Sequence, residues 1–423
     1  MKILSLKTWI LLGASLIIVL SAWDYKNSLN DFKSGRLDKK NTQGTEHAIE
    51  DIPAFAQKGI DYLAQVQFSN GGWGAGTHAN QQMIDPTQVQ VDPATTAFAA
   101  MALLRAGNTL EKGVYSQNLR KALDYLLNLV EKSPEEGDRI TDIEGTQPQV
   151  KLGRNIDATM CVQFLIRIEP HTREDKALND RVSQSINKCL LKIKQSQDED
   201  GNTRGGGWAP VLQSAMANNA LELAISTGRD VDQKVLDKSR KNQKENMGAS
   251  GELRTEKSAG VALYSVTSVQ RATAKETRRV QDIMMRGKED GTLSDNAPVT
   301  IENLKKVEST LSDEEAQIIV QAYAQNQSTL SQMKDDNVIA GFGNNGGEEF
   351  LSFMLTSESL VITGGEEWNN WKNRMNEMLA KIQNGDGSWN GHHCITSPVF
   401  CTAAAILALT AENDKDLLIG EKK

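Results

Sequence analysis

The adjacent histidines His392 and His393 are the densest group of chemically reactive side chains in a sequence that has five histidines. They lie in residues 391–396, just before an apolar helical run that begins at Pro398. An imidazole titrates near neutral pH and can act as an acid, a base or a metal ligand. The pair is therefore a candidate catalytic site. The alternative is that the two histidines only satisfy local backbone groups.

Acidic residues stand where several apolar helical runs are expected to begin. They are Asp92, Asp157, Glu348 and Glu349. Helix N-termini offer unpaired amide groups and a partial positive charge, so several such starts at one mouth of a cavity can form a site. Asp157 is therefore a candidate acid or base beside His392 and His393. Helix capping is the alternative for Asp92 and Asp157.

Zinc-binding residue types also occur in this region, at His393, Cys394 and Cys401. Their spacing alone does not specify a metal site, so we assign no metal ligand and no cofactor from the sequence. The remaining cysteines are Cys161 and Cys189. In an exported chain four cysteines allow three disulfide pairings, which the sequence does not separate, and free buried thiols are an equal alternative.

Apolar residues recur at helical spacing along most of the chain, and the helical segments fall into two sets. The amphipathic set has one charged face and comprises residues 54–67, 118–131, 180–195, 231–246 and 368–383. The other set is richer in small residues and comprises residues 93–106, 156–168, 214–227, 258–273, 349–363 and 398–411. Because small side chains let helices approach closely, we expect the second set to lie inside the first.

The two sets predict an all-α protein in which residues 51–415 form an (α/α)6 toroid. Residues 277–286 or 312–333 are the candidates for the sixth outer helix. Residues 287–345 exceed a normal connection between helices, so we interpret them as an insertion over a rim that carries at least one extra helix.

A short motif marks the turns between the two sets. Residues 383–389 read Gln-Asn-Gly-Asp-Gly-Ser-Trp, and residues 67–73 repeat the pattern Gln-x3-Gly-x-Trp. A third copy begins at residues 197–201, where an insertion delays the closing Gly206-Gly207-Trp208. An indole buries a large apolar face and needs one partner for its N–H. We expect these Gln and Trp residues to hold repeats together rather than to do chemistry.

This motif resembles the QW repeat of the squalene/hopene cyclase and protein prenyltransferase superfamily. The resemblance implies a terpenoid cyclase-like toroid, in which the glutamine caps a neighbouring helix and stacks on the tryptophan. Class II cyclases protonate their substrate through an Asp-x-Asp-Asp motif, which this sequence lacks. Protein prenyltransferases hold zinc with an Asp, a Cys and a His at inner-helix starts. Here Cys401 stands near the position of that histidine.

The N-terminus has the layout of a targeting segment. Residues 8–23 form an apolar run that follows Lys2 and Lys7, so we predict that residues 1–23 are a signal peptide or a signal-anchor helix. Residues 24–50 are polar and are expected to form a flexible linker. The body is then extracytoplasmic, either anchored to the membrane through its N-terminal segment or secreted. A net charge of −8 argues against a nucleic-acid partner.

Three functions fit such a toroid. The first is binding of a hydrophobic small molecule or a protein partner in the central cavity, without turnover. The second is an exported enzyme acting on an isoprenoid or another lipid, with His392, His393 or Asp157 as acid or base. The third is an enzyme acting on a polysaccharide, for which converging carboxylates would be the sign. Intact repeat motifs beside missing catalytic motifs favour the first.

Overall fold

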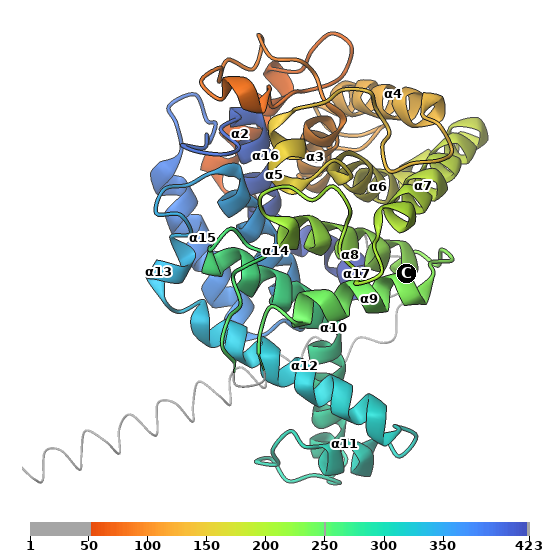
Figure 1. The fold of residues 1–423 in the computed structure, drawn as a ribbon, viewed down its shortest axis with the longest axis vertical. Coiled ribbons are helices and arrows are strands. Elements are labelled where there is room, and N and C mark those ends of the chain that lie inside the picture. Colours follow the sequence, from red (N-terminus) through yellow and green to blue (C-terminus); the bar gives the residue numbers. More distant parts are fainter. Residues whose placement is uncertain (1–51, 249–250, 421–423) are drawn as a thin grey trace, which may run out of the picture. The chain divides into compact units, whose positions relative to one another are not determined.

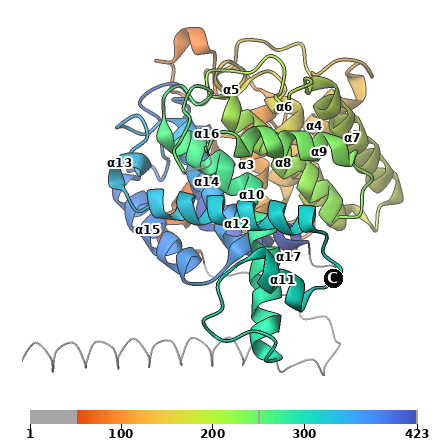
Figure 2. The same ribbon diagram turned by 60° about the horizontal axis from the view of Figure 1, so that its bottom comes forward.

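Apolar and amphipathic helices alternate along the chain in the computed structural model, which describes residues 52–248 and 251–420 (Figures 1 and 2). Within those ranges the protein is all-α and contains no β-strand. The apolar helices are buried along most of their length. They are α3 (Pro93–Arg105), α6 (Ile156–Ile168), α8 (Pro210–Ser226), α10 (Ala262–Glu289), α14 (Gly347–Thr363) and α16 (Pro398–Leu409).

The amphipathic helices bury one face each. They are α2 (Ala54–Gln65), α4 (Ser116–Lys132), α7 (Lys176–Ser196), α9 (Gln233–Lys244), α12 (Asp313–Gln332) and α15 (Glu366–Ile382). In α4, for example, Leu119, Leu123, Leu126 and Val130 are buried and recur every three or four residues. This spacing places them on one side of the helix.

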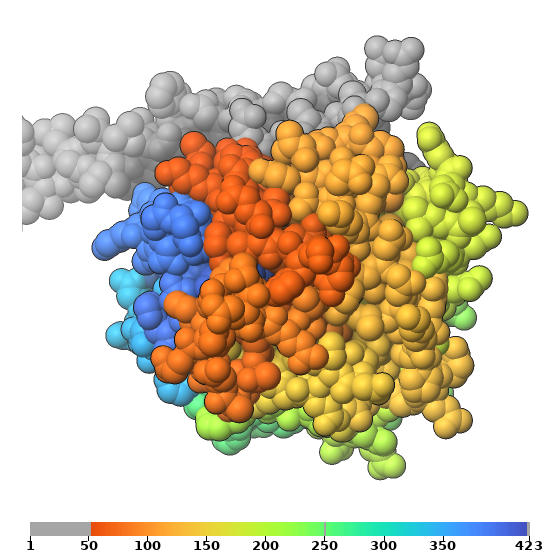
Figure 3. Space-filling view, turned by 90° about the horizontal axis from the view of Figure 1, so that it is seen from above, coloured from red at the N-terminus to blue at the C-terminus, as the bar shows by residue number. Residues whose placement is uncertain are grey.

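Each apolar helix packs against the next one along the chain. α3 packs on α6, α6 on α8, α8 on α10, α10 on α14 and α14 on α16. α16 packs in turn on α3, so the last apolar helix contacts the first. Figure 3 shows this proximity at the surface, where red and orange residues from the start of the described chain lie beside blue residues from its end.

The Trp-bearing turns have the same geometry near both ends of the described chain. Trp73 and Trp389 are fully buried, and their indole N–H groups donate to the carbonyls of Leu63 and Leu379 at 2.8 and 2.9 Å. The backbone N–H of each tryptophan also donates to a threonine hydroxyl of the following apolar helix, at 2.9 Å. Each tryptophan therefore joins the end of an amphipathic helix to an apolar one.

The glutamines of these turns join neighbouring amphipathic helices. Gln67 Nε2 donates to a carbonyl of its own turn at 2.7 Å and to the carbonyl of Asn118 in α4 at 2.9 Å. Gln383 Nε2 makes the equivalent two bonds, the second to Phe55 in α2, both at 2.8 Å. The indole N–H thus bonds to backbone rather than to the glutamine, and the glutamine links one helix to the next.

The third copy of the motif keeps the glutamine and the glycine but not the tryptophan. Gln197 Nε2 donates to the carbonyl of Val235 in α9 at 2.8 Å. Gly201 has a φ of 86°, close to the 91° of the equivalent glycines in the other copies, a region that favours glycine. The residue two positions later is Thr203, and Trp208 is 63% exposed. Trp208 is therefore not the buried anchor that the sequence suggested.

Residues 287–345 contain α11 (Ile301–Val307), α12 and α13 (Asp336–Ile339). α12 packs along α10 (Figure 2), and its residues Ala316, Ile319 and Ala322 are buried. A separate small core is shared by the second half of α10, α11, α12 and the loops between them. It consists of Val280, Ile283, Met284, Leu293, Leu304, Leu311 and Ile319. α12 is thus a separate amphipathic helix, as expected for one of the two candidates for the sixth outer helix, whereas the other candidate, residues 277–286, is a continuation of α10.

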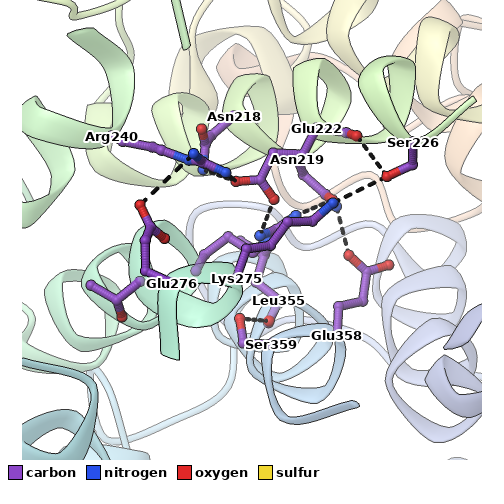
Figure 4. A network of polar contacts seen from close by, with 12 residues as sticks. Asn218, Asn219, Glu222, Ser226, Arg240, Lys275, Glu276, Leu355, Glu358 and Ser359 are labelled. Carbon is purple, nitrogen blue, oxygen red and sulfur yellow. Dashed lines mark hydrogen bonds and ion pairs between the residues drawn. The ribbon is translucent and has the colours of Figure 1, made fainter. Parts of the chain in front are cut away.

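A network of buried charges joins the apolar helices away from their starts (Figure 4). Glu358 in α14 forms ion pairs with Arg105 of α3 and, at 3.3 Å, with Arg167 of α6. Its other oxygen accepts from Asn219 of α8 at 2.6 Å. Asn219 accepts in turn from Arg271 of α10 at 2.8 Å.

Glu222 in α8 is the second acid of this network. It binds Arg271 at 2.6 Å and Arg240 at 2.5 Å, and the two cations lower the pKa of Glu222 to about 2 although burial alone would raise it. Asp414 similarly pairs with Arg105 and Arg167. Opposite charges thus face one another in this part of the helix assembly, as burial of ions requires.

Residues 1–51 lie outside the described residues, so the signal or signal-anchor segment and the linker stay predictions. In the described part of the chain, no helix has both the length and the apolar character needed to span a membrane.

Candidate functional site at the start of the apolar helices

Three segments that are distant in the sequence meet where α14 and α16 begin. The backbone N–H of Thr396 donates to Gln147 Oε1 at 2.7 Å, and the Thr396 hydroxyl donates to the carbonyl of Gln81 at 2.7 Å. Gln147 is the first residue of α5 (Gln147–Leu152). Gln81 Nε2 also donates to the carbonyl of Cys394 at 2.9 Å. These bonds hold the loop of residues 391–396 in a defined position.

Glu348, His393 and Cys394 each place one potential metal-ligating atom within 4.8 Å of the others. Glu348 lies in the first turn of α14 and is buried, whereas His393 and Cys394 are partly buried. Cys394 has a φ of 57°, a conformation that side chains make unfavourable. Such backbone strain concentrates at functional sites.

One ring nitrogen fixes the orientation of His393. Its Nε2 lies 2.6 Å from the carbonyl oxygen of Asn344. Because a carbonyl only accepts, Nε2 of the neutral ring carries the proton and Nδ1 carries a lone pair. Nδ1 is buried and has no hydrogen-bond partner among the residues that the structure describes. A histidine held in this way is suited to bind a metal or to accept a proton, since metal-binding histidines are commonly anchored through the other nitrogen.

The structure separates the two candidate histidines. His392 is exposed, and its backbone N–H donates to the carbonyl of Asn345 at 2.7 Å. Its side chain is not among the groups that meet at Glu348 and Cys394. Of the adjacent pair, His393 alone contributes to the cluster.

Lys151 in α5 supplies a positive charge to the site. Its Nζ lies 4.2 Å from the ring centre of Trp208, within the range of a cation–π interaction. Burial and Glu348 raise the pKa of the Cys394 thiol to about 11, against the opposing effect of Lys151. Burial and Glu349 raise the pKa of Glu348 to about 7. At neutral pH the thiol is therefore protonated and Glu348 is partly protonated.

Two exposed aromatic rings flank these polar groups. Trp208 covers Lys151, and Phe342 is 56% exposed with its ring centre 5.2 Å from that of His393. Exposed apolar side chains beside convergent polar groups are typical of ligand sites. We call the following residues the mouth cluster: Lys151, Trp208, Phe342, Glu348, His393 and Cys394.

Asp157 and Asp92 are fully buried. Their hydrogen-bond partners described below are not residues of the mouth cluster. Asp92 accepts from the backbone N–H groups of Thr95 and Ala75, which is the capping role considered for it. Asp157 Oδ2 accepts from Gln149 Nε2 at 2.6 Å, and its Oδ1 has no hydrogen-bond partner within residues 52–248 and 251–420. Burial and then the charge of Asp92 raise the pKa of Asp157 to about 8. Asp157 is therefore a carboxylic acid that stays largely protonated at neutral pH.

Replacing Asp157 by asparagine is expected to change how stability depends on pH. Because the pKa of Asp157 is raised from 3.8 to about 8, its stabilising contribution is complete at low pH and is lost as the pH rises through this interval. The asparagine does not ionise, so from about pH 4 to about pH 8 the variant should gain about 2–5 kcal/mol relative to the parent. Urea unfolding at the two pH values measures this gain.

Thr159→Ala is the control, because it removes the buried bond from the Thr159 hydroxyl to Asn155 at 3.1 Å but no titrating group, so its effect on stability should be the same at both pH values. An Asp157→Asn effect that is equal at both pH values would contradict the raised pKa.

The cysteines are free thiols in the structure. Cys401 is fully buried and its Sγ lies 3.7 Å from the carbonyl oxygen of Ile395. The possible zinc ligands that meet in the structure are therefore Glu348, His393 and Cys394. The set considered from the sequence had Cys401 in the place of Glu348.

Lys151 and Trp208 could not be found as site residues by motif. Lys151 lies in a helix of six residues, in which spacing shows little. For Trp208 a signal was present, because the insertion before it breaks the Gln-x3-Gly-x-Trp spacing. A tryptophan out of register with its repeat is free to serve another role.

Comparison with known proteins gives no family assignment: no protein-family model matches the chain, and no curated protein sequence matches it.

Proposed function

We propose that the described helices form an (α/α)6 toroid of the terpenoid cyclase and prenyltransferase kind. The cyclic packing of six apolar helices supports this proposal, because α16 packs back on α3. The six amphipathic helices then form the outer layer. Equivalent hydrogen bonds at Gln67 and Gln383 support the same arrangement, since a repeated unit gives repeated contacts.

We propose that this toroid binds a hydrophobic ligand or partner at the mouth cluster, without a requirement for turnover. The observation that carries this function is the pair of exposed rings, Trp208 and Phe342, beside the buried polar groups Lys151 and Glu348. The buried ion pairs of Glu358 and Glu222 occupy the space between the helices farther from their starts. A ligand therefore has its apolar contacts at the mouth of the ring rather than beyond the charge network.

The resemblance to protein prenyltransferases also implies a zinc ion, and the mouth cluster fits one. Glu348, His393 and Cys394 supply oxygen, nitrogen and sulfur donors within 4.8 Å of one another, and Nδ1 of His393 is an unpaired buried acceptor. Three protein ligands with one open position are typical of catalytic zinc. When bound, such an ion polarises a ligand and favours the thiolate form of a cysteine.

The alternative is an exported enzyme acting on an isoprenoid, another lipid or a polysaccharide. A hollow of about 690 Å³ favours the polysaccharide form of this alternative. It is lined by Arg139 and Ile143, and the Ile143 carbonyl accepts from Gln149, the residue that also bonds Asp157. Asp157 itself is fully buried and does not line the hollow, whereas the acids Glu136, Asp138 and Asp142 do, and converging carboxylates are the sign of such an enzyme. Release of reducing sugar by the purified protein would favour this alternative over simple binding.

Metal analysis of the purified full chain tests the site. After dialysis against zinc, we expect about one zinc ion per chain in the parent. His393→Ala and Cys394→Ser should each lower the affinity for zinc by about tenfold or more, because each removes one ligand. His392→Ala and Cys401→Ser are the matched controls and should keep the parent's zinc content. A zinc-free parent, or a Cys394→Ser variant that binds as the parent does, would refute the metal part of the proposal.

Ligand binding is tested separately with dansyl-labelled farnesol. Trp208→Ala with Phe342→Ala should weaken binding of this probe by about tenfold or more, because two exposed apolar surfaces are lost. Val114→Ala, at a residue that is 83% exposed and outside the mouth cluster, is the control. Equal binding by the parent and the double variant would exclude the mouth cluster as the hydrophobic site.

A further inference from the structure

A second candidate site lies at the other end of α14 from the mouth cluster. A hollow of about 370 Å³ is lined by residues of α10, by Ile362 of α14 and by Ile419 of α17 (Lys415–Ile419). Ile362 is 14 positions after Glu348 in one helix, which corresponds to about 21 Å along its axis. The hollow is therefore distinct from the site proposed above.

Cations dominate the walls of this hollow. They are Lys275, Arg278, Arg279 and Arg286, all from α10, and the lining contains one acid, Asp282. Lys275, Arg279 and Arg286 follow one another at intervals of four and seven residues, a spacing that keeps them on one side of the helix. The sequence of α10 thus concentrates positive charge along one face.

Direct ion pairs balance only part of this charge, and the exposed acids Asp290 and Glu315 act on Arg286 and Arg279 at longer range and through solvent. Arg278 pairs with Asp282 at 3.2 Å, while Arg279 and Arg286 share Glu308 at 3.1 and 2.6 Å. Lys275 donates to the neutral hydroxyl of Ser226 at 3.1 Å. Glu222 and Glu276 also act on Lys275, but both of these acids already pair with Arg240. A mobile anion would complete the balance.

The floor of the hollow is apolar. Ile283 and Ile362 are buried, and Ile419 is partly exposed beside them. Arg279 and Arg286 carry side chains that are 46% and 54% exposed, so their guanidinium groups are open to solvent above this floor. A cationic rim over isoleucines suits a molecule that has both an anionic group and an aliphatic part.

We propose that this groove of α10, α14 and α17 binds the phosphate headgroup of an anionic phospholipid. The guanidinium groups of Arg279 and Arg286 bind the phosphate oxygens, for which their planar donors are suited. The isoleucines receive the glycerol and the first methylene groups of the acyl chains. The partner is then a membrane surface, and the mouth cluster at the opposite end of α14 is left free.

The full chain in a neutral detergent is titrated with short-chain phosphatidylglycerol, and the thermal midpoint is recorded. Short-chain phosphatidylcholine tests the need for net negative charge, and inorganic phosphate tests the need for the lipid. We expect the parent to bind phosphatidylglycerol at least about tenfold more tightly than either. Arg279→Gln with Arg286→Gln should lower this affinity by at least about tenfold, because both guanidinium groups that bind the phosphate are lost.

Arg120→Gln with Arg181→Gln is the matched control. These two arginines are also exposed and also pair with glutamates, but they lie on α4 and α7. The control variant should bind as the parent does. Equal responses to the two lipids, an unchanged affinity in the Arg279/Arg286 variant, or an equal response to inorganic phosphate would each overturn the proposal, and the last would identify a free-phosphate site instead.

Discussion

Trp389→Ala is expected to lower the free energy of unfolding by about 3–5 kcal/mol, which is the usual cost of removing a buried aromatic side chain. The indole of Trp389 is fully buried, packs edge-on against Phe55 at 6.3 Å and donates to the carbonyl of Leu379. Its loss opens a cavity between α15, α16 and α2. Urea unfolding followed by circular dichroism measures the change.

Trp208→Ala is the matched control, because Trp208 is 63% exposed. We expect this substitution to change stability by about 0.5 kcal/mol or less. Similar unfolding midpoints for Trp389→Ala and the parent would show that the repeat turns do not hold the helices together.

Glu358→Ala is expected to cost about 3–5 kcal/mol, because it leaves buried cations without their partner. Glu358 is 1% exposed, pairs with Arg105 and Arg167, and accepts from Asn219. Asp414 contacts both arginines as well, so after the substitution one acid would remain for two buried cations, and Asn219 would lose its carboxylate acceptor. The same unfolding measurement applies.

Glu131→Ala provides the comparison for this second substitution. It breaks the ion pair with Arg181, in which both side chains are 40% exposed. Pairs of this kind contribute about 1 kcal/mol or less. If the two alanine variants were equally stable, the buried network would contribute no more than a surface pair.

The helical character and the repeat turns could be predicted from the sequence, because both depend on local patterns. The buried face of α4 can be predicted from spacing alone, because its apolar residues recur every three or four positions, at Leu119, Leu123, Leu126 and Val130. The bond partners of Gln67 were not accessible, because Asn118 is 51 positions away and only packing brings it close. The charge network was also missed, since Arg105 and Glu358 lie in apolar helices and are 253 positions apart, so that only packing brings them together.

Part of the candidate site could also be predicted from the sequence, because two of its residues are neighbours in the chain. His393 and Cys394 drew attention as neighbours in the sequence, whereas Glu348 comes beside them only in the folded chain, where its carboxylate accepts from the N–H of Ile395. Lys151 reaches the site because Gln147, at the start of its helix, bonds to Thr396. His392 was proposed as a site residue because it is adjacent to His393. In the loop, however, the His392 residue is exposed whereas His393 is partly buried.

Contact between α3 and α16 also bears on how the protein is made. Arg105 donates to the carbonyl of Leu407 at 2.9 Å, across 302 positions of sequence. At an elongation rate of about 5–20 residues per second, the ribosome synthesises Leu407 roughly 15–60 s after Arg105. During this interval the apolar face of α3 is open to water and to other nascent chains. Any truncation before α16 would make this exposure permanent, so premature termination should yield aggregates or proteolytic fragments rather than a shorter soluble protein.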